Sequence, residues 1–233
     1  MLDKENFQAT INGILGNDAD YNEKAHRLKT LLAEKFQSGE VEIGADFDGT
    51  IIDEKPLRDI TRKAIGGIIL NISRDIFYFS LKIQPFFRKI IALIAGLITY
   101  FFHGNPRIFF ALLKNRRQEE IDDYIKFVSQ RTKVERQVLK QLSGKKVIII
   151  SRNGLSLIES IINKQEKIFV DHGVKIVGVI ANELIFEKDK DNEIHCQGFR
   201  HPLITTSFKS LILPKELPYI VKGKENVILN KQV

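Results

Sequence analysis

The most constraining feature of this 233-residue sequence is a pair of short apolar runs, each of which ends abruptly in polar residues and glycine. Val41–Ala45 is followed by Asp-Phe-Asp-Gly-Thr at 46–50, and Lys146–Ile150 by Ser-Arg-Asn-Gly at 151–154. A short apolar run bounded by turn residues is typical of a buried strand. We therefore expect two core strands, each leading into a polar loop.

The rest of the chain alternates between helical and strand patterns. Helical spacing of leucines predicts a helix within residues 1–38, and a longer helical pattern runs from Pro56 to Leu142. Further segments are an amphipathic helix at 155–167, β-rich runs at 174–179 and 183–187, a hairpin turn at 188–193 and a last core strand at 217–221. This order predicts an α/β layered fold with a mostly parallel sheet, whose sites form at the carboxyl ends of its strands.

Two aspartates separated by one residue, Asp46 and Asp48, follow the first strand. At a strand end they can converge on one metal ion and one phosphate, and such crowding of negative charge requires a cation. We expect Asp46 to attack phosphorus and form an aspartyl-phosphate. Asp48 would protonate the leaving alcohol and later deprotonate the attacking water. Gly49 allows a sharp turn, and the Thr50 hydroxyl can donate a hydrogen bond to the phosphate.

The two polar strand ends resemble motifs of a known family. The run at 46–50 resembles the first motif of the haloacid dehalogenase superfamily of phosphotransferases, and Ile148–Ser151 resembles the second. The long helical spacing between them is similar to the phosphoserine-phosphatase-like branch, which carries a helical cap after the first motif. Val177–Phe186 also resembles the β-rich stretch that follows the second motif in that branch. The resemblance covers residues 41–225.

The resemblance implies a three-layer, Rossmann-like α/β core with an inserted α-helical cap. In this interpretation residues 1–40 are an N-terminal helical segment of the core. Residues 41–55 and 141–233 form the core itself, and residues 56–140 form the cap.

The resemblance also implies the rest of the site. In that family the Ser or Thr of the second motif binds the phosphate, so we assign this role to Ser151, together with Asn153 in the same loop. A helix N-cap is an alternative role for Ser151, and the two roles are compatible. Lys209 is the candidate for the family lysine that holds phosphate and aspartate together. The implied cofactor is Mg²⁺, with Asp46 and Asp48 among its ligands.

The C-terminal part of the family pattern is degenerate here. The family has further aspartates after the last strand, whereas this sequence has none beyond Asp191. Glu225 is therefore the remaining carboxylate that we assign to the metal, because magnesium accepts a glutamate oxygen and keeps water in most positions. An ordinary surface charge is the alternative for Glu225, as a surface lysine is for Lys209. A chain that has lost full activity, or that lacks part of its C-terminus, fits the same observation.

The predicted insert is basic and apolar. Between Glu54 and Arg117 there are twelve Lys or Arg residues against three acidic ones, and Ile90–Phe102 carries no formal charge. This run is shorter than the about 20 apolar residues that cross a bilayer. A helix buried in the cap is the first interpretation. Contact of residues 82–117 with an anionic membrane surface is the second, and attraction of an anionic substrate is the third.

Composition argues against several other classes of site. With Cys196 as its one cysteine, the chain can form neither an internal disulfide nor a thiolate metal cluster, and we expect this residue to be packed rather than catalytic. The histidines show no metal-ligand spacing and are interpreted as structural. No nucleic-acid motif accompanies the positive charges, so nucleic acid is a poor candidate partner. The N-terminal residues lack the apolar run of a secretory signal, so we expect a cytoplasmic protein, with peripheral membrane contact as the alternative.

Two functional hypotheses follow from the sequence. The first is a magnesium-dependent phosphatase that hydrolyses a phosphorylated substrate, with a lipid phosphate or a phosphoprotein among the candidates. The second is a catalytically impaired module of the same fold that binds a membrane or a protein partner through its basic apolar insert.

Overall fold

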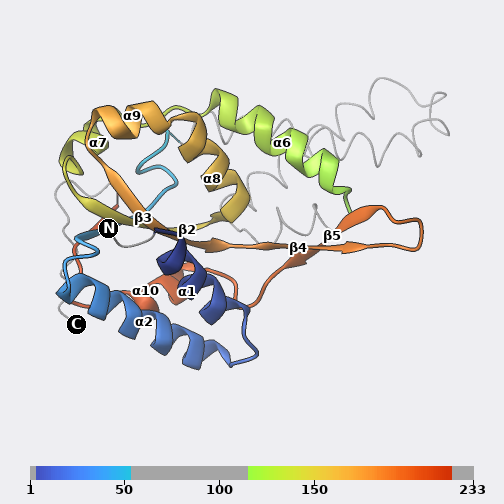
Figure 1. The fold of residues 1–233 in the computed structure, drawn as a ribbon, viewed down its shortest axis with the longest axis horizontal. Coiled ribbons are helices and arrows are strands. Elements are labelled where there is room, and N and C mark those ends of the chain that lie inside the picture. The colour runs from blue at the N-terminus through green and yellow to red at the C-terminus, as the bar shows by residue number, and fades with distance from the viewer. Residues whose placement is uncertain (1–3, 54–114, 222–233) are drawn as a thin grey trace, which may run out of the picture.

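The computed structural model describes residues 4–53 and 115–221, and the statements below concern these residues (Figure 1). The helices are α1 (Lys4–Gly16), α2 (Tyr21–Gln37), α6 (Gln118–Arg131), α7 (Arg136–Gln141), α8 (Leu155–Lys164), α9 (Glu166–Asp171) and α10 (Thr206–Ile212). The strands are β1 (Ile43–Ala45), β2 (Lys146–Gly154), β3 (Lys175–Asn182), β4 (Leu184–Lys188), β5 (Ile194–Phe199) and β6 (Tyr219–Ile220).

A parallel sheet with the strand order β3-β2-β1-β6 lies at the centre of the fold. β1 and β2 are the two inner strands, and Gly44 of β1 lies opposite Ile148 of β2 on one side and Tyr219 of β6 on the other. The predicted α/β class with a mostly parallel sheet is confirmed. Because the strands are parallel, their carboxyl ends meet at one edge of the sheet, where α/β proteins form their sites.

The side chains of β2 contribute to two separate halves of the hydrophobic core. Val147, Ile148, Ile149 and Ile150 are all fully buried. Successive side chains of a strand point to opposite faces, so Val147 and Ile149 join one buried cluster while Ile148 and Ile150 join the other. Burial of one such side chain contributes about 1.5–3 kcal/mol relative to exposure. The segment Val147–Ile150 is apolar throughout because helices cover both faces of the strand.

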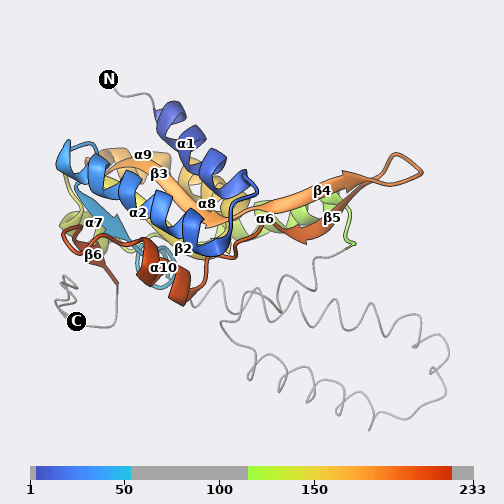
Figure 2. The same cartoon turned by 90° about the horizontal axis from the view of Figure 1, so that it is seen from below.

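The helices form one layer on each face of the sheet. α1, α2 and α10 cover one face through buried side chains such as Ile11, Leu28 and Phe208 (Figure 2). α7, α8 and α9 lie on the other face, where Leu139 and Ile158 are fully buried, and α6 packs against α8 and β5 (Figure 1). The predicted three-layer core is therefore present.

The N-terminal helical segment consists of two helices rather than the single helix that the sequence predicts. The helical structure is interrupted between Gly16 and Tyr21. There Asp20 is extended, and its side chain accepts a hydrogen bond from the Glu23 N–H at 2.8 Å. This bond satisfies one of the free donors at the start of α2. α2 is closed by Gly39, whose φ of 70° suits glycine.

β4 and β5 form an antiparallel hairpin that extends away from the parallel sheet (Figure 1). The predicted turn at 188–193 lies between these two strands. Cys196 of β5 is free and fully buried, and with Ile121 of α6 it forms a small apolar cluster. This burial raises the pKa of the Cys196 thiol, as is typical of a packed cysteine.

Most of the predicted cap lies outside the described residues, so its boundaries at 56–140 stay a prediction. The part that the structure does describe includes α6 and α7, whose Val128 and Leu139 pack in the same cluster as α8 and the sheet. The apolar run Ile90–Phe102 falls outside these residues. Among the helices of the described ranges, none has both the length and the apolar character that crossing a membrane requires.

Candidate active site

The predicted site residues lie where β1 and β2 end. Asp46 directly follows β1, and its N–H donates to the Ile220 carbonyl of β6 at 3.0 Å, which extends the strand pairing by one residue. Ser151 and Asn153 lie in the last part of β2, the neighbour of β1. Lys209 approaches the same edge from α10. Four candidates from three separate segments thus meet at one end of the sheet.

The loop after β1 is fixed by apolar anchors. Phe47, Ile51 and Ile52 are fully buried, and the Ile52 N–H donates to the Phe47 carbonyl at 3.1 Å. Gly49 has a φ of 68°, a conformation that favours glycine, and this residue makes the sharp turn. Thr50 is 1% exposed and is therefore enclosed in the loop. The anchors hold the backbone that carries the two aspartates.

Lys209 forms an ion pair with Asp46. Its Nζ lies 2.5 Å from Asp46 Oδ1, and the two side chains are only 11% and 19% exposed. The start of α10 is fixed by Thr205, whose side chain accepts a hydrogen bond from the Phe208 N–H at 3.2 Å. Lys209 is therefore held in the site. The alternative left open by the sequence, a lysine on the surface, does not apply.

Asp48 is held by two side chains of β2. The Ser151 hydroxyl donates to Asp48 Oδ2 at 2.9 Å, and the Asn153 amide donates to Asp48 Oδ1. The Asn153 N–H in turn donates to the Ser151 hydroxyl oxygen at 3.0 Å. In this structure Ser151 and Asn153 thus bind the second aspartate of the loop, in addition to the phosphate role that the resemblance implies.

The surroundings of Asp48 alter its proton affinity. Burial raises the pKa of Asp48 to about 6, and the negative charge of Asp46 acts in the same direction. The hydrogen bond from Ser151 and the positive charge of Lys209 oppose this rise. A carboxyl group with a pKa in this range can donate and accept a proton near neutral pH.

The donor atoms at this edge fit a magnesium ion. Magnesium prefers oxygen ligands, and the site contains two carboxylates with the single positive charge of Lys209 in contact with one of them. Both carboxylate oxygens of Asp48 accept hydrogen bonds from β2. If an ion binds here, the Asp46 carboxylate and the Asp48 backbone carbonyl are the oxygens that would hold it, as the sequence resemblance implies. Glu225, the third predicted ligand, lies outside the described residues.

Asn182 is a site-region residue that the sequence reasoning did not single out. It is the last residue of β3, it is 1% exposed, and its side chain forms hydrogen bonds with Arg152 and Ile204. The available signal was its position, because a polar residue that ends an apolar strand is placed at the same sheet edge as Asp46 and Ser151.

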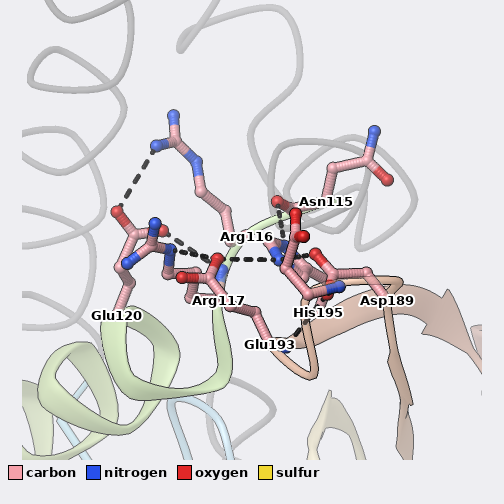
Figure 3. A network of polar contacts seen from close by, with 8 residues as sticks. Asn115, Arg116, Arg117, Glu120, Asp189, Glu193 and His195 are labelled. Atoms are coloured by element: carbon pink, nitrogen blue, oxygen red, sulfur yellow. Dashed lines mark hydrogen bonds and ion pairs between the residues drawn. The ribbon is translucent and has the colours of Figure 1, made fainter.

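A second polar cluster lies where the hairpin meets the residues before α6 (Figure 3). The Nε2 atom of His195 is 3.0 Å from Asp189 Oδ2 and 3.4 Å from Glu193 Oε2, in charge contacts that lack hydrogen-bond geometry. Its Nδ1 atom is 3.1 Å from the Asn115 carbonyl. Both ring nitrogens therefore face acceptors. The pKa of His195 is raised mainly by the Asn115 carbonyl and to a lesser extent by the two carboxylates.

The side-chain donor atoms of Asp189, Glu193 and His195 lie within 4.8 Å of one another, a spacing that a cation could use. The guanidinium of Arg117, however, already lies 3.0 Å from Glu193 Oε2 and supplies positive charge to the cluster. We therefore describe it as an ion-pair network that joins the hairpin to the start of α6. The sequence did not reveal it, because its members come from different segments that meet only in the fold.

Comparisons with known proteins do not assign the chain to a family. No family model and no curated protein matches it. Among solved structures, the crystal structure of cytosolic 5'-nucleotidase IIIB bound to cytidine is similar, with a TM-score of 0.33 and 16% sequence identity. The match covers 80% of this chain and 66% of that chain, so this chain spans just under two thirds of its length. We rest no functional inference on a similarity of this size, which also does not single out the phosphoserine-phosphatase-like branch.

Proposed function

We propose that the protein is a magnesium-dependent phosphomonoester hydrolase of the haloacid dehalogenase type. The observation that carries the proposal is the Lys209–Asp46 ion pair beside Asp48, which is itself held by Ser151 and Asn153. A nucleophilic carboxylate, a second carboxylate for proton transfer and a lysine thus share the carboxyl edge of a parallel sheet. The sequence resemblance of the two strand ends supports the same chemistry.

In the first step of the proposed mechanism, an oxygen of the Asp46 carboxylate attacks the phosphorus atom. The bond between phosphorus and the ester oxygen breaks, and its electron pair stays on the leaving alcohol. The Asp48 carboxyl group donates its proton to that oxygen. Asp46 then carries the phosphoryl group as an acyl phosphate, and Asp48 is ionised.

In the second step, a water molecule attacks the phosphorus atom while Asp48 accepts one of its protons. The bond between phosphorus and the Asp46 oxygen breaks, and its electron pair returns to the carboxylate. Inorganic phosphate leaves, and both aspartates regain their starting states. One group acts as acid and then as base, which suits a pKa near 6.

The remaining residues bind and orient. Lys209 offsets the charge of Asp46 and would contact the phosphate oxygens. The Ser151 hydroxyl donates its single proton to Asp48 Oδ2 in this structure, and it would turn to donate to a phosphate oxygen when the substrate enters. Bound magnesium, held by the Asp46 carboxylate and the Asp48 carbonyl, would offset the negative charge that gathers when the phosphate enters. The candidate substrate classes are lipid phosphates, phosphoproteins and small phosphorylated metabolites.

Turnover of an aryl phosphate tests the proposal. In magnesium buffer the wild-type protein should release phosphate, EDTA should stop the reaction and added magnesium should restore it. Asp46→Asn keeps the shape of the side chain but removes the nucleophilic charge, so it should abolish turnover. Asp171→Asn, the same change at an exposed position at the end of α9, is the matched control and should retain wild-type activity.

Unchanged activity in the folded Asp46→Asn variant would contradict the mechanism. Activity that survives EDTA and dialysis would contradict the role of magnesium alone. The same assay, repeated with a lipid phosphate, a phosphopeptide and small phosphorylated metabolites, ranks the three substrate classes by kcat/KM.

A further inference from the structure

The ladder between β2 and β3 is interrupted at the candidate site. Ile150 is opposite Ile180, whereas Gly154 is opposite Asn182, so β2 contains two more residues than β3 between these pairs. Such a bulge bends a strand and redirects its side chains. The extra length lies in the segment that contains Ser151 and Asn153, the two residues that hold Asp48. The shape of this bulge therefore determines where the second aspartate of the site is held.

The side chain of Asn182 makes a hydrogen bond inside the bulge. Its Nδ2 atom donates to the Arg152 carbonyl at 2.5 Å, and Arg152 lies between Ser151 and Asn153 in the sequence. Asn182 is 1% exposed, so water does not readily replace this donor. The amide thereby fixes the backbone between the two residues that bind Asp48.

The same amide also holds the segment that leads into α10. The Ile204 N–H donates to Asn182 Oδ1 at 2.7 Å, and Asn182 Nδ2 approaches the Ile204 carbonyl at 3.4 Å. The next residue, Thr205, is the N-cap of α10, and its carbonyl accepts from the Lys209 N–H at 2.9 Å. The position of the lysine that pairs with Asp46 therefore depends on a segment that Asn182 fixes.

We infer that Asn182 is a positioning residue that sets the relative placement of Asp48 and Lys209. This inference rests on the proposed hydrolase function for its catalytic consequence. One buried side chain joins the β2 bulge to the start of α10, two segments that contribute opposite parts of the site. Since a displacement of about 1 Å at a catalytic group can cost about a hundredfold in rate, loss of this connection should reduce turnover more than substrate binding.

Two variants separate the two connections. Asn182→Leu is similar in size and removes the donor and the acceptor together. Asn182→Asp keeps an acceptor for the Ile204 N–H but loses the donor to the Arg152 carbonyl. Ile180→Ala, at a fully buried position in the same strand, is the control for loss of stability without loss of these hydrogen bonds.

Two measurements are made on all four proteins. The first is kcat and KM for an aryl phosphate in magnesium buffer, at a temperature where circular dichroism shows each variant to be folded. The second is hydrogen exchange, followed by mass spectrometry, in peptides that cover residues 150–154 and 204–210. Exchange requires no activity, so it reports on the positioning role by itself.

We expect kcat of Asn182→Leu to fall by at least about tenfold while KM changes by less than about threefold, and Ile180→Ala to keep both values near wild type. Exchange should rise in both peptides in Asn182→Leu, and mainly in 150–154 in Asn182→Asp. Wild-type kcat in folded Asn182→Leu, or exchange that rises only within β3, would overturn the inference. A wild-type protein without magnesium-dependent turnover refutes the proposed function instead, and the exchange result then decides the inference alone.

Discussion

Replacement of Lys209 by methionine should destabilise the protein more than replacement of Asp46 by asparagine. Lys209 Nζ is 2.5 Å from Asp46 Oδ1, and its charge also lowers the pKa of Asp48. Without the lysine, two neighbouring carboxylates are left in a site that is largely closed to water. Without the Asp46 charge, the lysine still faces Asp48, and the repulsion between the two carboxylates is gone. The two halves of one ion pair are therefore not equivalent.

The size of the difference can be estimated from the burial of the pair. Removal of one partner of a buried ion pair costs about 3–5 kcal/mol. Because 11% of the Lys209 side chain and 19% of the Asp46 side chain remain exposed, we expect the lower end, about 3 kcal/mol, for Lys209→Met. Asp46→Asn loses a charged hydrogen bond but relieves repulsion, so we expect about 1–2 kcal/mol.

Urea unfolding in EDTA measures these values for the wild type, both single variants and the double variant. EDTA keeps bound metal from contributing to the free energy of unfolding. The double-mutant cycle should give a coupling energy of at least about 1 kcal/mol, since the two side chains are in direct contact. Lys164→Met, at an exposed position at the end of α8, is the control and should change the free energy of unfolding by less than about 0.5 kcal/mol.

The reasoning is refuted if Lys209→Met costs no more than Asp46→Asn, or if the coupling energy is close to zero. Either result would mean that solvent screens the pair, as it does for surface ion pairs.

Two further predictions concern the sheet and the hairpin. A Cβ atom on Gly44 would lie 2.7 Å from a ring carbon of Tyr219, so Gly44→Ala should cost about 1–3 kcal/mol of unfolding free energy, whereas Gly13→Ala, in an open part of α1, should not destabilise. The pKa of His195 is raised, chiefly by the Asn115 carbonyl, so its stabilising effect is full below the unfolded pKa of about 6.5 and is lost as the pH rises through the folded pKa. NMR titration of the His195 ring should give a pKa above that of an unstructured peptide, and a value at or below it would contradict the described ion-pair network.

The central sheet could be predicted because its strands carry a strong local signal. Val147–Ile150 is apolar on both faces, and Val41, Ile43 and Ala45 are apolar too, as strands covered by helices on both faces require. Since parallel strands end at one edge, the meeting of Asp46 with Ser151 follows from the order of the segments. The break at Asp20 was missed, although an Asp three residues before Glu23 is a typical helix start.

Other parts of the site depend on contacts between distant segments. Lys209 lies 163 positions from Asp46, and it was selected among many lysines by the resemblance together with its position before the last predicted strand. The bulge that directs Ser151 and Asn153 towards Asp48 arises from the register between β2 and β3, which composition does not encode locally. The network around His195 likewise forms where the hairpin turn packs beside residues 115–117. Sequence patterns specify elements more readily than the pairings between them.

Chemical trapping tests the role of Asp46 as the nucleophile most directly. The wild-type protein is mixed with excess aryl phosphate and magnesium, quenched during turnover and treated with borohydride, which reduces an acyl phosphate and so converts the aspartate into homoserine. Peptide mass spectrometry should find homoserine at position 46, none at position 48 and none in the absence of substrate. Continued turnover with an unmodified Asp46, or trapping at another residue, would contradict the proposed mechanism.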